Sequence, residues 1–162
     1  QRIGAIFGPD TASTGLERRT GFARALERLG ASLPNSLTFS GPFSSTTGSQ
    51  GFQYLWKAKP TAIFCANDVI ALGALSEAAA LGVRIPKDVT LVGFDNIPMS
   101  SWNIFGLTTI GVSLEEMAMT AVGLLTRRME DTEREVQRVT MQPLLTLRST
   151  HGRPRALEEE TR

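Results

Sequence analysis

The stretch TAIFCANDVIALGALSEAAALGVRIPKDVTLVGFD, from Thr61 to Asp95, decides the fold of this chain. Its first part, the apolar run Thr61–Cys65, is too short for a helix and predicts a buried strand. Asn67 is expected to cap a helix that ends at Gly82, because asparagine suits the N-cap and glycine the left-handed position after the last turn. Val89–Phe94 predicts a second strand. Together they imply two parallel strands joined by a right-handed crossover.

The rest of the sequence continues this alternation of strands and helices. Further strands are expected at Ile3–Phe7, Leu37–Phe39 and Leu107–Gly111, with closing strands at Val136–Gln142 and Leu144–Leu147. Helices are expected at Thr14–Leu29, Thr46–Ala58 and Leu114–Met129. Capping boxes head the first and last of these helices, with Thr14 and Ser113 as the capping residues. The pattern predicts an α/β fold with a mainly parallel open sheet and helices on both faces.

Composition and charge exclude several classes of protein. The net charge of +1 gives no electrostatic reason to expect nucleic-acid binding by this chain itself. Cys65 is the one cysteine and lies in an expected strand, so a disulfide framework is excluded and a reducing compartment is favoured. No signal peptide opens the chain and no apolar run approaches membrane-spanning length. Gln1-Arg2 leads directly into a strand, which we interpret as a cut from something longer.

The sequence gives little support to an enzyme. His151 is the only histidine, and it opens the polar segment His151–Arg162, which we expect to be a frayed tail. A serine or cysteine nucleophile would therefore have no plausible base. Phosphate-loop and dinucleotide-binding glycine patterns are absent, as is any histidine and cysteine cluster for a metal. We expect no catalytic residue, metal or cofactor.

Polar residues follow the two central strands where each one ends. Asn67 and Asp95 are expected just past the carboxyl ends of neighbouring parallel strands, the edge where such sheets bind ligands. Asp95 also fits a turn, which its chemistry alone favours. If Asn67 caps the helix through its side-chain oxygen, its amide NH₂ can still donate into a cleft.

Three motifs carry a resemblance to a known family. TAIFCANDVIALGAL, LGVRIPKDVTLVGFDN and LTTI at Leu107–Ile110, in this order and spacing, resemble the effector domain of the lactose/galactose-repressor (LacI/GalR) family of bacterial transcription regulators. The likeness runs from about Arg2 to Arg148. It implies a periplasmic-binding-protein-like fold of two subdomains with the effector between them, behind a helix-turn-helix segment that this sequence lacks.

The resemblance also divides the chain. Residues 1–112 match the second effector subdomain, which is of α/β type. Residues 113–150 match the elements that return to the missing first subdomain, together with the closing strands. Residues 151–162 are left as the flexible tail.

Five residues receive ligand-binding roles from the resemblance: Thr14, Arg18, Phe43, Asn67 and Asp95. Arg18 would make forked contacts to a carboxylate or to paired hydroxyls, and Asp95 would accept hydrogen bonds from effector hydroxyls or amines. Phe43 would stack on a ligand ring. Plain alternatives exist: a solvated side chain for Arg18, local packing for Phe43, and helix capping for Thr14 and Asn67.

These inferences predict a truncated effector-sensing and dimerisation domain of a cytoplasmic transcription regulator. Its partners would be a small polar effector (a sugar, polyol or purine) and operator DNA, the latter only through the missing helix-turn-helix; no membrane partner is expected. Val112 replaces a polar contact of many relatives, which weakens the case for a typical sugar site. The main alternative is a periplasmic sugar-binding protein of a transporter, and an unrelated doubly wound enzyme is a distant third.

A cluster of apolar residues after Asp95 predicts a homodimer surface: Met99, Trp102, Ile104 and Phe105. They follow neither a helical nor a strand period, and a loop of this kind, if exposed, marks an association surface. The alternative is that they fold back as a lid on their own sheet. The apolar stripe of the helix Leu114–Met129, without its usual partner, offers a second and artificial route to association.

Overall fold

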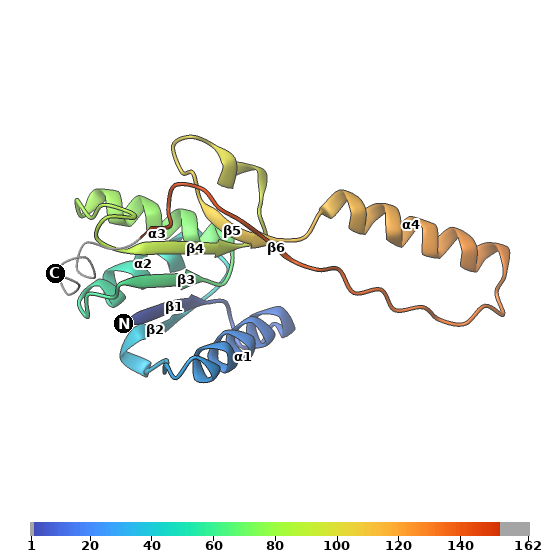
Figure 1. Cartoon of the computed structure of the whole chain (residues 1–162), viewed down its shortest axis with the longest axis horizontal. Coiled ribbons are helices and arrows are strands. Elements are labelled where there is room, and N and C mark those ends of the chain that lie inside the picture. The colour runs from blue at the N-terminus through green and yellow to red at the C-terminus, as the bar shows by residue number, and fades with distance from the viewer. Residues whose placement is uncertain (1, 153–162) are drawn as a thin grey trace.

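The computed structural model describes residues 2–152, which form an open sheet with helices on both faces and a projecting arm (Figure 1). The strands are β1 (Ile3–Phe7), β2 (Thr38–Ser40), β3 (Ala62–Cys65), β4 (Thr90–Phe94), β5 (Thr108–Gly111) and β6 (Leu144–Thr146). The α-helices are α1 (Ser13–Arg28), α2 (Ser45–Trp56), α3 (Asp68–Ala80) and α4 (Leu114–Glu130). Two short 3₁₀ turns, η1 (Asn35–Leu37) and η2 (Pro98–Ser101), complete the elements of the described residues.

The sheet is parallel except at one edge, as the alternating pattern predicted. Its strand order is β2-β1-β3-β4-β5-β6, and only the pairing of β6 with β5 is antiparallel. The predicted crossover from β3 through α3 to β4 is confirmed, and both strands end at the same edge. The expected strand at Val136–Gln142 is wrong: the stretch has no strand conformation and is not part of the sheet, and its first residues lie beside the helix α4, which cannot pair with a strand.

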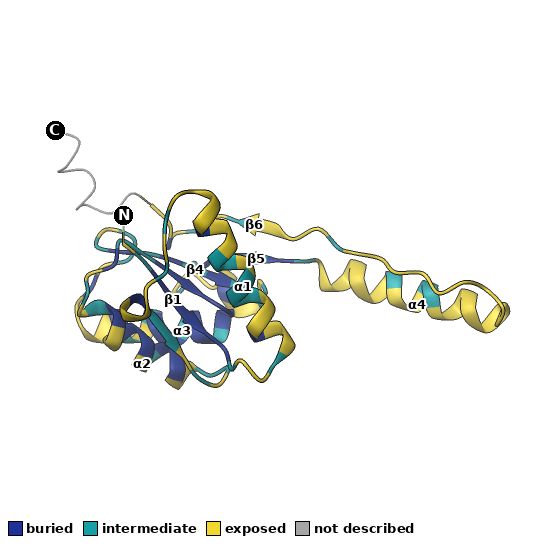
Figure 2. Ribbon diagram, turned by 90° about the horizontal axis from the view of Figure 1, so that it is seen from below, coloured by how far each residue is buried: buried dark blue, intermediate teal, exposed yellow. Residues whose placement is uncertain are grey.

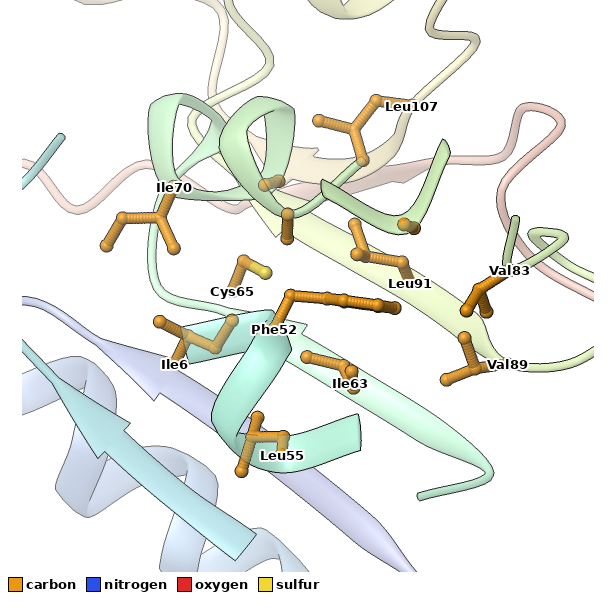
Figure 3. Close-up of a cluster of buried hydrophobic side chains, with 13 residues drawn as sticks. Ile6, Phe52, Leu55, Ile63, Cys65, Ile70, Val83, Val89, Leu91 and Leu107 are labelled. Carbon is orange, nitrogen blue, oxygen red and sulfur yellow. The ribbon is translucent and has the colours of Figure 1, made fainter. Parts of the chain in front are cut away.

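Alternate residues of the strands build the core on opposite faces of the sheet. Ile6, Ile63 and Leu91 point toward α2 and α3, where Phe52 fills the centre of the main cluster (Figure 3). The neighbouring positions carry a smaller cluster on the face covered by α1, made by residues such as Phe7. Figure 2 shows most of the buried residues in the sheet and in the helices that cover it. The two-residue period of a strand is what separates the two clusters.

Glycines let α2 and α3 touch backbone to backbone. A Cβ added at Gly48 would stand 1.9 Å from the Ile70 carbonyl oxygen, and one added at Gly73 would stand 2.0 Å from that of Ser45. Glu77 of α3 links the same two helices through side-chain hydrogen bonds from α2. These contacts hold α3 closely against α2.

The helix starts follow the sequence signals in two cases of three. Asn67 Oδ1 accepts a 2.9 Å hydrogen bond from the Ile70 N–H, and Ser113 caps α4 in the same manner. The capping box at Thr14 is wrong: α1 begins at Ser13, and Ala12 occupies the cap position without a side-chain bond. The preceding turn, closed by a hydrogen bond from the Ala12 N–H to the Pro9 carbonyl, moves the cap position two residues before Thr14.

The beginning of the expected tail is tied to the sheet. Thr90 Oγ1 donates to the Gly152 carbonyl at 2.7 Å, and His151 Nδ1 lies 3.1 Å from Thr108 Oγ1. Thr150 is buried and exchanges hydrogen bonds with the backbone of Leu91. The prediction of fraying from residue 151 is therefore wrong for its first two residues. Residues 153–162 lie outside the described part.

α4 and the returning chain form an arm, defined as residues 114–143, that projects from the sheet (Figure 1). No residue of α4 is buried, and Met129 at its far end is 74% exposed. The arm belongs to the stretch assigned by resemblance to a first subdomain outside this sequence. None of the helices within residues 2–152 combines the length and apolar character that a membrane span requires.

Candidate functional site

An ion pair at the carboxyl edge of the sheet joins two of the predicted ligand-binding residues. Arg18 Nη2 donates to Asp95 Oδ1 at 2.6 Å, and Arg18 Nη1 donates to the Ala66 carbonyl at 2.6 Å and more weakly to Asp95 Oδ2 at 3.4 Å. The guanidinium also lies 4.2 Å from the centre of the Phe94 ring. Elements 77 residues apart in the chain thus meet in one forked contact.

The backbone that presents Asp95 is unusual. Asp95 and Asn96 both have positive φ values, of 108° and 53°, which non-glycine residues seldom adopt. The Asp95 N–H donates to the Ile110 carbonyl at 2.7 Å. A Cβ at Gly111 would come within 2.8 Å of the Asp95 carbonyl oxygen, so this turn also needs a glycine beside it. Backbone of this kind gathers at binding sites and persists only where its surroundings hold it.

A cavity of about 490 Å³ opens beside the pair. It is lined by Thr14, Glu17, Arg18, Gly21, Phe22, Phe64, Phe94 and Ile110. Phe22 stacks on Phe64, with ring centres 4.5 Å apart. The wall therefore has a largely apolar part with three aromatic rings, and its charged side chains are those of Arg18 and Glu17. Such a surface can take the flat apolar face of a small ligand and fix its polar edge.

The predicted residues occupy different places around this cavity. Thr14 is exposed and lines it with Arg18, and Asp95 reaches it through the ion pair. Asn67 is only 9% exposed, directly follows Ala66, and uses its side-chain oxygen as the α3 cap. Phe43 is half-buried against both hydrophobic clusters and is not among the lining residues. Its geometry matches the local-packing alternative, and ligand contact by any of the five stays a prediction.

Sequence reasoning missed most of the aromatic wall. Phe94 lies opposite Ile110 in the register of β4 and β5, and Phe64 faces the same side from β3. The signal was present in the two-residue alternation, since Phe64 and Phe94 are out of phase with the positions of the main core. Phe22 carried no such signal, because its contact depends on how α1 crosses the sheet.

Asp68 is a second residue whose role the sequence concealed. The sequence placed it in the first turn of α3 as a favourable charge, but the structure buries it completely and gives it three hydrogen-bond donors. Burial raises the pKa of the neighbouring Cys65 thiol, and the negative charge of Asp68 raises it further. The thiol is thereby kept protonated, which suits a core residue and not a nucleophile. Within residues 2–152 no three His, Cys, Asp or Glu side chains come together in a way that could hold a metal.

The predicted association surface lies on the loop after Asp95. Trp102 is 54% and Ile104 is 81% exposed, whereas Phe105 is half-buried and stacks on Trp102. A groove of about 420 Å³ separates this loop from α3 and includes Leu75 among its lining residues. The loop therefore does not close as a lid over its own sheet.

Comparison with known proteins identifies the family to which the chain belongs. The sequence profile of the family described as periplasmic binding protein-like domain matches residues 1–151. The HTH-type transcriptional repressor PurR of Escherichia coli O1:K1 is 34% identical over 147 residues, which are 90% of this chain and 43% of PurR. The chain thus spans less than half the length of the curated relatives that it matches.

Solved structures agree. The Escherichia coli transcriptional repressor AscG superposes with a TM-score of 0.85 at 27% identity, over 93% of this chain and 55% of AscG. The regulator CelR in complex with cellobiose gives a TM-score of 0.83 at 28% identity, over 93% of this chain and 46% of CelR. A LacI-family sugar-binding transcriptional regulator from Escherichia coli, complexed with phosphate, gives 0.85 at 28% identity, over 95% and 56%. The chain belongs to the family of periplasmic binding protein-like domains, in the form that LacI-type transcription regulators carry.

Proposed function

We propose that this chain is the effector-sensing and dimerisation part of a bacterial transcription regulator that works in the cytoplasm. The observation that carries the proposal is the Arg18–Asp95 pair beside an aromatic cavity at the carboxyl edge of a parallel sheet. A small polar effector would bind there, with further contacts from residues outside this sequence. Its differential affinity for two arrangements of the subdomains would bias the regulator toward one of them.

The roles of the five residues follow from their placement. Arg18 and Asp95 would exchange part of their mutual contact for hydrogen bonds to the ligand, and Thr14 would contact it from the exposed side. Asn67 would donate through its amide while its oxygen caps α3. Phe43 would act from the second layer, because it packs against the cluster that contains Phe64 and fills the space beside Gly8, where an added Cβ would stand 2.2 Å from its ring.

Calorimetry with a defined set of probes tests the binding site. Ribose, cellobiose, hypoxanthine and inorganic phosphate cover the chemistry of sugars and purines and that of the ligands in the two liganded regulator structures. We expect at least one probe to bind, and Arg18→Met or Asp95→Asn to weaken it about 10-fold or more, since each leaves the other charge unpaired. Arg84→Met is the matched control, because it breaks an exposed ion pair remote from the cavity. Equal binding by wild type, Arg18→Met and Asp95→Asn would reject the site.

Dimerisation would use η2 and the loop after it, together with α3. Met99, Trp102 and Ile104 are exposed, and Ile104 and half-buried Phe105 line the groove against α3. These four side chains supply the aromatic and aliphatic anchors usual at interface centres. Sedimentation of the wild type beside Trp102→Glu and Met117→Glu separates this surface from association through the arm. We expect only Trp102→Glu to abolish the dimer. The proposed interface would be contradicted if only Met117→Glu abolished the dimer, or if the wild type were monomeric at micromolar concentration.

Operator DNA would be bound only through a helix-turn-helix outside this sequence. The net charge of +1 supports this, because specific DNA binding needs a basic face and a recognition helix. In a mobility-shift assay at physiological salt we expect no operator complex with this chain, and a tight one would overturn the proposal. A transporter's sugar-binding protein shares the fold, but the relatives named above are all transcription regulators.

A further inference from the structure

We propose that Asp68 is a positioning residue of the binding site, which holds the Asp95 carboxylate where Arg18 can pair with it. Asp68 touches neither the cavity nor Arg18. It would act through the backbone of the turn that carries Asp95. The inference rests on the proposed function for its meaning, but its test needs no ligand.

Asp68 is a buried carboxylate that gathers three separate parts of the chain. Its Oδ2 accepts hydrogen bonds from the Ile97 N–H at 2.9 Å and from Ser100 Oγ at 2.6 Å, and its Oδ1 accepts one from Thr109 Oγ1 at 2.5 Å. The side chain is fully buried, so water does not compete for these contacts. Hydrogen bonds to a charged acceptor are roughly twice as strong as neutral ones. The turn, η2 and β5 are therefore held to the start of α3 at one point.

These contacts bracket Asp95 along the chain. On one side, a Cβ at Gly93 would lie 2.3 Å from Asp68 Oδ1, so the carboxylate packs directly against the strand two residues before Asp95. On the other side, Asp68 binds the N–H of Ile97, two residues after Asp95. Thr109 Oγ1, which donates to Asp68, also accepts a hydrogen bond from the backbone N–H of Asn96, with 3.4 Å between the nitrogen and the oxygen.

The bracket supplies the restraint that the turn requires. Two successive non-glycine residues with positive φ relax toward ordinary conformations unless the surroundings oppose it. Such a relaxation would swing the Asp95 side chain away from Arg18, because the backbone dihedrals set the direction of its Cβ. Arg148, which donates to Asn96 Oδ1 at 2.8 Å, adds a weaker restraint from the surface.

The test is the guanidinium of Arg18, observed by ¹⁵N NMR in the full chain. In the wild type, the forked contact should slow rotation about the Nε–Cζ bond, which exchanges the two Nη nitrogens, and give two resolved Nη resonances. Asp95→Asn is the reference for a weakened pair. We expect Asp68→Ala to merge the two resonances although Arg18 and Asp95 are both present. Asp68→Asn should restore them in part, because one amide oxygen can serve both Ile97 and Ser100 while the Thr109 hydroxyl turns to accept.

Ser100→Ala is the matched control, since it loosens η2 and leaves the Ile97 contact in place; it should keep both resonances. Two resolved resonances in a folded Asp68→Ala variant would overturn the proposal and leave Asp68 as an anchor of the loop alone. If Asp68→Ala does not fold, the variant Thr109→Val replaces it in the test. Merged Arg18 resonances in Thr109→Val, with resolved resonances in Thr109→Ser, would support the proposal. Resolved resonances in Thr109→Val would reject it. Failure of the proposed function would appear separately, as absence of probe binding by a wild type whose Arg18 resonances are resolved.

Discussion

α2 and α4 are both amphipathic helices, but the molecule uses them in opposite ways. α2 has 12 residues and buries five of them, including Phe52 and Leu55, against the sheet and α3. α4 has 17 residues and buries none, although Met117, Val122 and Leu125 supply an apolar stripe. The difference shows that an apolar stripe predicts which face of a helix would be buried. Whether that face is buried depends on a packing partner elsewhere in the chain.

Hydrogen exchange should give the largest contrast between the two regions. An isolated helix of 17 residues is marginal in water, whereas α2 opens only when the core opens. We expect amides in the middle of α4 to exchange at least ~100-fold faster than those in the middle of α2. Mass spectrometry of the monomeric chain measures this. Slow exchange in α4 would mean that the arm is packed in solution, and it would contradict the contrast drawn between α2 and α4.

Truncating the core should cost far more than truncating the arm. Phe52 is fully buried and stacks on Trp56, so Phe52→Ala should destabilise the fold by about 3–5 kcal/mol in urea titrations. Leu125, which is 61% exposed, is the matched position in the arm. Leu125→Ala should change the unfolding free energy by less than about 0.5 kcal/mol. Similar losses from both variants would show that the arm shares the core.

Glycine substitutions should have opposite signs in the two regions. Gly73→Ala would place a Cβ 2.0 Å from the Ser45 carbonyl oxygen and force α2 from α3, which should cost about 1–3 kcal/mol. Gly123 in α4 has nothing nearer than an arginine nitrogen at 3.7 Å. Gly123→Ala should therefore raise the helix content of the arm, because alanine is the better helix former. Circular dichroism at 222 nm and thermal melts check both.

The smallest expected effect is a pH dependence. Hydrogen bonds from Ser49 and Gln53 lower the pKa of Glu77 below its ordinary value. Because the folded pKa is depressed, the stabilisation is present above the unfolded pKa of about 4.3 and is lost as pH falls through the folded pKa. Glu77→Gln should flatten the fall in melting temperature below about pH 4.3. Glu130→Gln, in the arm, should alter it less, and an equal change from both would contradict the assignment.

The sequence predicted those parts of the fold that local chemistry decides. The strand at Cys65, the cap at Asn67 and the stop at Gly82, whose φ is 67°, all depend on neighbours a few residues away. The stretch 136–142 has an apolar character but no strand beside it, and pairing is a property of two segments.

The candidate site shows the same division. Residues at strand ends could be placed at the correct edge, because the carboxyl ends of parallel strands lie together. The partner of Arg18 is 77 residues away, and two of the donors to Asp68 are 32 and 41 residues away. Contacts between residues so far apart in the sequence depend on how the elements pack, and a local sequence pattern does not predict them. The buried state of Asp68 was therefore hidden behind a role in the helix dipole that it fulfils as well.

The arm leaves the sheet through β5 and returns through β6, so two paired strands hold both of its ends (Figure 1). An arm held in this way would tilt about the strand pair as a lever tilts about its fulcrum. α4 is about 25 Å long at 1.5 Å per residue, so a tilt of about 10° at the fulcrum displaces its far end by roughly 4 Å. The arm begins three residues after Gly111, which lies against the Asp95 turn, so a small shift at that turn would be magnified at the other end of the arm.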